Sequence, residues 1–214
     1  MKLYSGPLSL FSAKARIALG EKGLPHELVQ VGWSRQAAYE PHHPDVVALN
    51  PKRQVPVLVD GELVVYDSTL IFEYLEERAP GPALYPTDRA ERARCRQQEA
   101  AADEIWFPHL WTLIEARVYG TSSDETAVAN AVGALEALYA GFDRAIDGRD
   151  YYCGGFSVAD IGTFIVVYAA GTLGAPIPES LRRLRAWSQR VGERSAVRSV
   201  IDDLNQAAAH AFAA

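Results

Sequence analysis

The run Ser9-Leu10-Phe11-Ser12 places two hydroxyl groups three residues apart, directly after a short apolar segment. Redox proteins carry a Cys-x-x-Cys pair at such a place, where a strand leads into a helix. The free backbone N–H groups and the positive end of the helix dipole there stabilise an anion such as a thiolate. A serine cannot be a sulfur nucleophile. We therefore expect this site to stabilise a sulfur that a ligand brings.

The two serines have different expected roles. Ser12 is explained by capping the N-terminus of the helix, whereas Ser9, one step further out, is the favoured hydrogen-bond donor to a thiolate. Both serines are catalytic candidates, because the sequence leaves open which of Ser9 and Ser12 contacts the sulfur. Lowering a thiol pKa by about two units needs roughly 2.7 kcal/mol. A hydroxyl bonded to a charged acceptor contributes about 1.5–3 kcal/mol, and a helix N-terminus adds up to about 1 kcal/mol. No general base is required.

The elements that position these residues alternate between strand and helix in the first part of the chain. Gly23 is the expected end of the first helix, and Asp60-Gly61 is a strong hairpin signal. The order is β-α-β-α-β-β-α, with a short helix or loop in the fourth place. The expected ranges are strand 1–4, helix 14–22, strands 26–31, 57–59 and 63–66, and helix 68–78.

A break at Pro80-Gly81-Pro82 separates this part from a second part with helical patterns only. Helices are expected over 89–113, where Pro108 should kink or end the helix, and over 125–146, 158–173 and 181–191. Ser157 and Asp160 have the spacing of a capping box, which serves folding. The predicted fold is an N-terminal α/β domain over 1–80, a linker over 81–88 and an all-helical bundle domain over 89–214.

Composition excludes several classes of function. The chain has 214 residues, 49% of them hydrophobic, and its net charge of −6 argues against a nucleic-acid binder. Its two cysteines, Cys95 and Cys153, and its five histidines show no metal-ligand spacing, so we expect no metal and no disulfide. The uncharged stretch 161–178 is interrupted by Gly and Pro, which favours a core helix over a membrane span. A cytoplasmic protein without a secretory signal is expected.

Two further segments carry a resemblance. Asn50-Pro51-Lys52-Arg53-Gln54-Val55-Pro56 sets a proline at the start of a strand, and Asp67-Ser68 opens the next helix. A trans Val55–Pro56 bond is the default, because only about 5% of X–Pro bonds are cis in folded proteins. With the serine run and the hairpin, the order resembles the cytosolic glutathione S-transferase superfamily over essentially the full chain.

This resemblance implies that the first domain, β-α-β-α-β-β-α, is thioredoxin-like and carries a glutathione site. Pro56 would be cis, and the backbone of Val55 would pair with the cysteinyl part of glutathione. The run Ser9 to Arg16 looks like the motif of the serine-type zeta and tau classes, in which the first serine, here Ser9, bonds the sulfur. Asp67-Ser68 would hold the γ-glutamyl end, although Glu or Gln is the commoner first member.

The glycyl end of glutathione has its own candidates. Arg53 and Gln54 stand where family members contact that end, and His42 or His43 stands where some classes place a further cation or donor. Solvated loop histidines are the alternative for those two.

A hydrophobic electrophile is the implied co-substrate. Candidates for its binding lie on the long helix and just after it, although core packing explains aromatic residues at helical spacing equally well. These candidates are Trp106, Phe107, Leu110, Trp111 and Tyr119.

The resemblance implies a homodimeric detoxification enzyme, a glutathione transferase. One alternative is a glutathione-dependent isomerase similar to maleylacetoacetate isomerase, although Leu10-Phe11 replaces the Ser-Cys of the zeta signature. Another is a non-catalytic ligand- or protein-binding member of the fold. A thiol-disulfide oxidoreductase is disfavoured, because neither cysteine stands at a helix start in the first domain.

Overall fold

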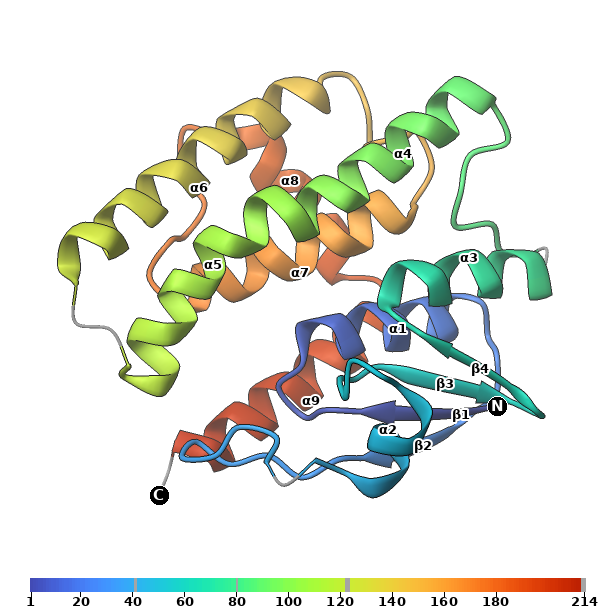
Figure 1. Ribbon diagram of the computed structural model, residues 1–214. Coiled ribbons are helices and arrows are strands. Elements are labelled where there is room, and N and C mark those ends of the chain that lie inside the picture. The colour runs from blue at the N-terminus through green and yellow to red at the C-terminus, as the bar shows by residue number, and fades with distance from the viewer. Residues whose placement is uncertain (41, 80, 122–123, 213–214) are drawn as a thin grey trace. The chain divides into compact units, whose positions relative to one another are not determined.

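The structure, a computed structural model, describes residues 1–40, 42–79, 81–121 and 124–212 (Figure 1). It forms two compact units. Unit 1 comprises Met1–Ala83 together with Arg194–Ala214, and unit 2 comprises Leu84–Glu193. The predicted boundaries placed all of 89–214 in one helical domain, whereas the final helix groups with unit 1.

Unit 1 is built on a four-stranded mixed sheet with the order β2-β1-β3-β4. β1 pairs parallel to β2 and antiparallel to β3, and β3 and β4 form the hairpin expected at Asp60-Gly61. Its elements in chain order are β1 (Lys2–Ser5), α1 (Leu10–Glu21), β2 (Glu27–Gln30), α2 (Pro44–Leu49), β3 (Val57–Asp60), β4 (Leu63–Tyr66) and α3 (Ser68–Arg78). The predicted thioredoxin-like order is confirmed.

The two faces of this sheet carry separate apolar layers. Tyr4 and Val57 are register partners and form a cluster with Val46 of α2. Leu3 and Leu58, the neighbouring pair in the register, are fully buried. Because successive strand residues point to opposite faces, this second pair belongs to the other layer. Both faces of the sheet are therefore covered, and its strand ends are left to carry a site.

The final helix, α9 (Ser195–Phe212), packs on α1. Arg16 is ion-paired with Asp203, and Arg194 with Glu21. At Gly20 an added Cβ would lie 2.9 Å from the Cβ of Ala196, so the two helices approach closely there. Periodicity predicts a helix but does not say which core the helix joins, which explains the difference in the predicted boundary.

Unit 2 consists of helical segments in its described residues. They are α4 (Arg89–Ala101), η1 (Ala102–Trp106), α5 (Phe107–Ile114), η2 (Glu115–Tyr119), α6 (Glu125–Ala145), α7 (Val158–Thr172) and α8 (Arg182–Gly192). Pro108 lies in the first turn of α5, directly after the π-helical segment η1. Proline lacks a backbone donor, and the change of hydrogen-bonding pattern at η1 accommodates it. The expected irregularity at Pro108 is thus a π-helical segment.

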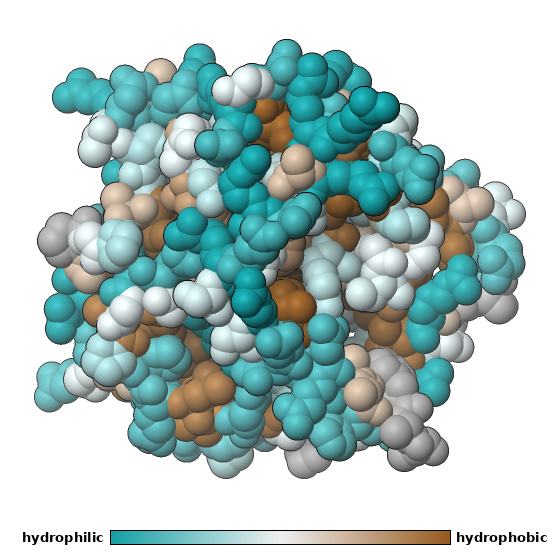
Figure 2. Space-filling model, turned by 180° about the vertical axis from the view of Figure 1, so that it is seen from behind, coloured by the Kyte–Doolittle hydropathy of each residue, from teal (hydrophilic) through white to brown (hydrophobic). Residues whose placement is uncertain are grey.

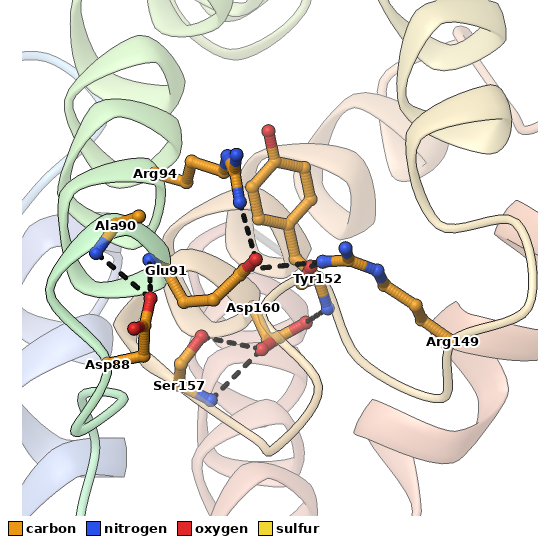
Figure 3. A network of polar contacts seen from close by, with 8 residues as sticks. All are labelled: Asp88, Ala90, Glu91, Arg94, Arg149, Tyr152, Ser157 and Asp160. Carbon is orange, nitrogen blue, oxygen red and sulfur yellow. Dashed lines mark hydrogen bonds and ion pairs between the residues drawn. The ribbon is translucent and has the colours of Figure 1, made fainter.

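The capping box at the start of α7 is confirmed (Figure 3). The backbone N–H and the hydroxyl of Ser157 donate to Asp160 at 3.0 and 2.8 Å. Asp160 also accepts from the backbone of Tyr152 at 3.0 Å and from the indole of Trp187 at 2.8 Å. These bonds join the loop before α7, the helix itself and α8.

The surface in Figure 2 is mostly hydrophilic, with hydrophobic residues in separate patches. Among the described residues, no helix combines the length and the apolar character that crossing a membrane requires.

Candidate functional site

At the N-terminus of α1, the two serines have structural roles that differ from the sequence-based prediction. Ser9 is the N-cap, and its Oγ accepts a hydrogen bond from the backbone N–H of Ser12 at 3.1 Å. The expectation that Ser12 is the cap is therefore wrong, and the helix begins at Leu10 instead of residue 14. Proposing the cap three residues too late is a register error, because both serines suit the position chemically.

Ser12 serves the loop that precedes the helix. It is fully buried, and its Oγ accepts from the backbone N–H of Gly6 at 3.2 Å. Ser9 is partly exposed. A hydroxyl that accepts one bond as a cap keeps its own proton for donation. Of the two serines, Ser9 thus has both the access and the free proton that a donor to a ligand needs.

The loop before β3 is organised by Asn50, which the sequence analysis did not single out. Its side-chain amide donates to the carbonyl of Gln54 at 2.7 Å, and its Oδ1 accepts from the backbone of Lys52 at 2.9 Å. Asn50 is buried, whereas Arg53 and Gln54 are exposed. The Asn-Pro dipeptide, a turn-forming signal, could have pointed to this role.

The Val55–Pro56 peptide bond at the end of this loop is cis. This agrees with the resemblance and not with the trans default. Pro56 is buried and Val55 partly buried. Within the described part of the chain, no backbone hydrogen bond occupies Val55.

The start of α3 carries an unsatisfied polar group. Ser68 is its first residue and is buried, and its Oγ has no hydrogen-bond partner among the described residues. Asp67, the N-cap, has φ +78°, accepts from the backbone of Thr69 at 3.1 Å and pairs with the Lys52 ammonium at 3.1 Å. A buried hydroxyl without a partner costs about 1–3 kcal/mol. A ligand acceptor at this helix N-terminus would remove that cost.

The two loop histidines have different surroundings. His42 Nδ1 lies 3.1 Å from the carbonyl of Tyr39 and 3.3 Å from a carboxylate oxygen of Glu40. His43 is the N-cap of α2, and its Nδ1 accepts from the backbone of Asp45 at 3.2 Å. His43 therefore has a structural role, and His42 is the one that stays a candidate for ligand binding.

Tyr4 is a further hydroxyl near the start of the chain. It donates to Asp45 at 2.7 Å, and this bond to a carboxylate raises the pKa of the tyrosine. The Tyr4 hydroxyl therefore uses its hydrogen in a bond to α2.

The aromatic candidates in unit 2 fall into two groups. Trp106 and Leu110 are buried, and Trp106 packs against Tyr139 and Phe142 with ring centroids 5.9 Å apart in each case. Core packing, the alternative in the sequence analysis, accounts for these two.

The second group forms a row of ring contacts. Phe107 and Trp111 have centroids 6.0 Å apart, as do Trp111 and Tyr119. Trp111 is 41% exposed, which is unusual for so large an apolar ring. These three remain candidates for contact with an apolar ligand.

Both cysteines are free and buried in unit 2. They are far apart in sequence, yet the structure brings their thiols within hydrogen-bonding range. The bond lowers the pKa of Cys95, the acceptor, and raises that of Cys153, the donor. Among the described residues, no group of three or more His, Cys, Asp or Glu side chains is arranged to hold a metal ion.

Comparisons with known proteins agree with this geometry. Residues 3–83 match the family model for the glutathione S-transferase N-terminal domain. A maleylpyruvate isomerase from Ralstonia sp is 34% identical over 189 residues, which cover 86% of this chain and 84% of that relative. The theta-class glutathione S-transferase from Xanthomonas axonopodis pv. citri, solved with glutathione bound, is 29% identical with a TM-score of 0.81, covering 94% of this chain and 96% of that one. The chain belongs to the cytosolic glutathione S-transferase superfamily.

A shorter match involves a protein with a different name. A stringent starvation protein A homolog from Coxiella burnetii is 43% identical over 98 residues, 45% of this chain and 43% of the relative. The chain thus spans less than half the length of that relative. The zeta- or tau-like subclass expected from the serine motif stays a prediction.

The residues of unit 1 fit glutathione as co-substrate. The Oγ of Ser68, which has no partner among the described residues, lies at a helix N-terminus, where it suits a carboxylate. The backbone of Val55, without a backbone hydrogen bond in the part of the chain that the structure describes, suits an extended peptide, and the partly exposed hydroxyl of Ser9 suits a thiolate.

Proposed function

We propose that this protein is a glutathione transferase in which Ser9 stabilises the glutathione thiolate for attack on a hydrophobic electrophile. The observation that carries the proposal is the state of the Ser9 hydroxyl. Its lone pair caps α1 by accepting from Ser12 N–H, while its proton is available at the positive end of the helix.

The proposed reaction depends on stabilising the negative charge of the glutathione thiolate. Glutathione's thiol, like free cysteine, is only a few per cent thiolate at neutral pH. The Ser9 O–H donates to the sulfur and contributes about 1.5–3 kcal/mol in favour of the thiolate. The thiol proton passes to solvent, the thiolate forms a carbon–sulfur bond with the electrophile, and the leaving group departs with its electron pair. Ser9 keeps its proton throughout.

Glutathione would lie across the strand ends of unit 1. Ser68 donates to the γ-glutamyl carboxylate, and Asp67 accepts from the α-ammonium, sharing its charge with Lys52 at 3.1 Å. The Val55 backbone, before Pro56, holds the cysteinyl residue. Arg53, Gln54 and His42 bind the glycyl carboxylate.

Exchanging each serine for alanine tests the assignment. We expect Ser9→Ala to raise the kinetic pKa of conjugation by about one to two units, because one charge-assisted hydrogen bond is lost, while glutathione affinity stays nearly unchanged. Ser12→Ala is the matched control and should keep the pH–rate profile. An unchanged profile in Ser9→Ala would contradict the role given to Ser9.

A glutathione-dependent isomerase is the second candidate, favoured by the 34% identity to a maleylpyruvate isomerase over most of both chains. The same glutathione thiolate, stabilised by Ser9, would add reversibly to the unsaturated substrate and leave after bond rotation, so glutathione is regenerated. Incubating maleylpyruvate with the protein and glutathione, followed by proton NMR, separates the two functions. Isomer without a glutathione adduct supports the isomerase, and a stable adduct supports the transferase.

A non-catalytic binding protein is the third candidate, in line with the partial match to a stringent starvation protein A homolog. Retention on a glutathione resin, with release by free glutathione, would favour an enzyme. A protein that passes through unretained would favour the binding module. The homodimer and the cytoplasmic location stay predictions, and light scattering of the purified chain measures the first.

A further inference from the structure

A pocket of about 530 Å³ lies within unit 1, next to the start of α1. Three segments line it, namely the turn before Ser9, the loop after β2 and the last turns of α9. Figure 1 shows the end of α9 beside the loop that follows β2. The lining residues are Pro7, Leu8, Trp33, Ser34, Arg35, Gln36, Ala207, His210 and Ala211. Its volume is typical of sites for small organic molecules.

The charge of this pocket is opposite to that of the protein. The chain has a net charge of −6, yet the ionisable side chains that line the pocket are Arg35 and His210, without an aspartate or glutamate among the lining residues. A concave site lined by one sign of charge attracts ligands of the other sign. The pocket therefore favours an anionic ligand.

Arg35 and His210 are the lining residues whose side chains can bind a carboxylate. An arginine stays charged at all working pH values and matches a carboxylate with two parallel N–H bonds. His210 Nδ1 lies 2.8 Å from the carbonyl of Gln206, so this nitrogen carries a hydrogen and donates to it. Nε2 is then the ring nitrogen left for a ligand, and it donates to a carboxylate when the ring carries both hydrogens.

The remaining walls suit a flat apolar body. Pro7, Leu8 and Trp33 come from the side of Ser9, and Ala207 and Ala211 come from α9. Trp33 supplies a large planar surface that packs well against conjugated or aromatic groups. Pro7 and Leu8 directly precede Ser9 in the chain, so a ligand here lies near the proposed thiolate.

We propose that this pocket binds the co-substrate, and that the co-substrate is a planar, conjugated or aromatic carboxylate whose acid group is held by Arg35 with help from His210. The inference rests on the proposed function for the reacting sulfur. Arg35 is in this proposal a specificity-determining residue, because it binds the carboxylate of the co-substrate and not the reacting carbon.

A matched pair of electrophiles tests the charge preference. 4-Chloro-3,5-dinitrobenzoate carries the carboxylate, and 2-chloro-1,3-dinitrobenzene is the same ring with the same leaving group and without the carboxylate. We expect Arg35→Gln to raise KM for the benzoate about tenfold, by loss of a charge-assisted bond pair, and to leave KM for the neutral compound unchanged. His210→Gln should act in the same direction with a smaller effect. Equal changes for both compounds would overturn the proposal.

Arg185→Gln is the matched control, because Arg185 is an exposed arginine of unit 2. It should leave both KM values unchanged. A benzoate-specific loss in this variant would mean that net charge and not the pocket selects the substrate.

A binding measurement separates this inference from the proposed function. Calorimetric titration without glutathione uses 3,5-dinitrobenzoate and 1,3-dinitrobenzene, which lack the leaving group. Tighter binding of the benzoate, lost in Arg35→Gln, supports the pocket even where no conjugation occurs, and in that case the transferase proposal fails alone. Equal affinities for the two compounds overturn the inference even where conjugation is rapid.

Discussion

The starts of α3 and α7 use the same two residue types in opposite ways. At α7, Ser157 and Asp160 are buried, and Asp160 accepts four hydrogen bonds from protein donors. At α3, Asp67 is partly exposed, and Ser68 is buried with an Oγ that has no partner among the described residues. The first arrangement is complete without a ligand, and the second is not. Satisfaction of the polar groups, and not residue type, separates a structural helix start from a binding one.

The backbone conformations at the starts of α3 and α7 differ as well. Ser157 has extended φ and ψ of −149° and 174°, which any residue adopts easily. Asp67 has φ +78°, a region that non-glycine residues rarely occupy and that tends to mark functional sites. The structure maintains a less favourable conformation at α3, where Lys52 and the N–H of Thr69 hold the aspartate.

The largest expected effect is a loss of stability at the start of α7, the helix start that is complete without a ligand. Asp160→Ala should lower the free energy of unfolding by about 3–5 kcal/mol, because it leaves several buried donors without an acceptor. Urea denaturation measures this. Asp160→Asn, which keeps one acceptor oxygen, should lose less. A loss below about 1 kcal/mol in Asp160→Ala would remove the distinction between the two helix starts.

A substitution at the start of α3, the helix start that is incomplete without a ligand, should change ligand binding and not the free energy of unfolding. Ser68→Ala should weaken glutathione binding about tenfold or more, because a hydroxyl bond to a carboxylate contributes about 1.5–3 kcal/mol. The free energy of unfolding without ligand should stay the same or rise slightly, since the hydroxyl has no partner to lose among the residues that the structure describes. Calorimetric titration and urea denaturation of one preparation give both numbers. Clear destabilisation with normal binding would make Ser68 a structural residue.

A substitution at the start of α1 should affect both the free energy of unfolding and the reaction. Ser9→Ala should lower the free energy of unfolding by about 1 kcal/mol, because the cap on Ser12 N–H is lost. Ser9→Gly should cost only a few tenths of a kcal/mol, because glycine is tolerated at an N-cap. Both variants lack the hydroxyl and should show the same raised kinetic pKa. Kinetic pKa values that instead follow stability would mean that Ser9 acts through the helix alone.

The smallest expected effect concerns a surface carboxylate that serves as a reference. The hydroxyl of Tyr74 donates to Asp60 at 2.6 Å and holds the pKa of Asp60 below its ordinary value. Stability from this bond is therefore present above the ordinary pKa and is lost as the pH falls through the lowered one. In Tyr74→Phe, an NMR titration should show the Asp60 pKa moving upward. An unmoved pKa would assign the shift to Arg78, which lies 3.3 Å from the same carboxylate.

Local signals in the sequence predicted much of the fold correctly. The Asp60-Gly61 hairpin, the helix opened by Asp67 and the Ser157–Asp160 box depend on neighbours within a few residues, and each is confirmed. The Ser9 cap was assigned three residues too late, because two serines fit the same local pattern. The core role of Trp106 could not be separated from a ligand role, because both produce the same helical spacing.

The sequence by itself determined which residue types stand at the helix starts, the order of the elements and the resemblance that names glutathione. Tertiary structure decided which hydroxyl is buried, which one is accessible to a ligand and which one lacks a partner among the described residues, because these properties depend on neighbours distant in the chain. It also placed α9 with unit 1, where Arg16 meets Asp203, and brought His210 to the same pocket as Arg35. Periodicity defines a helix and its apolar face, but packing against a particular surface selects its partner.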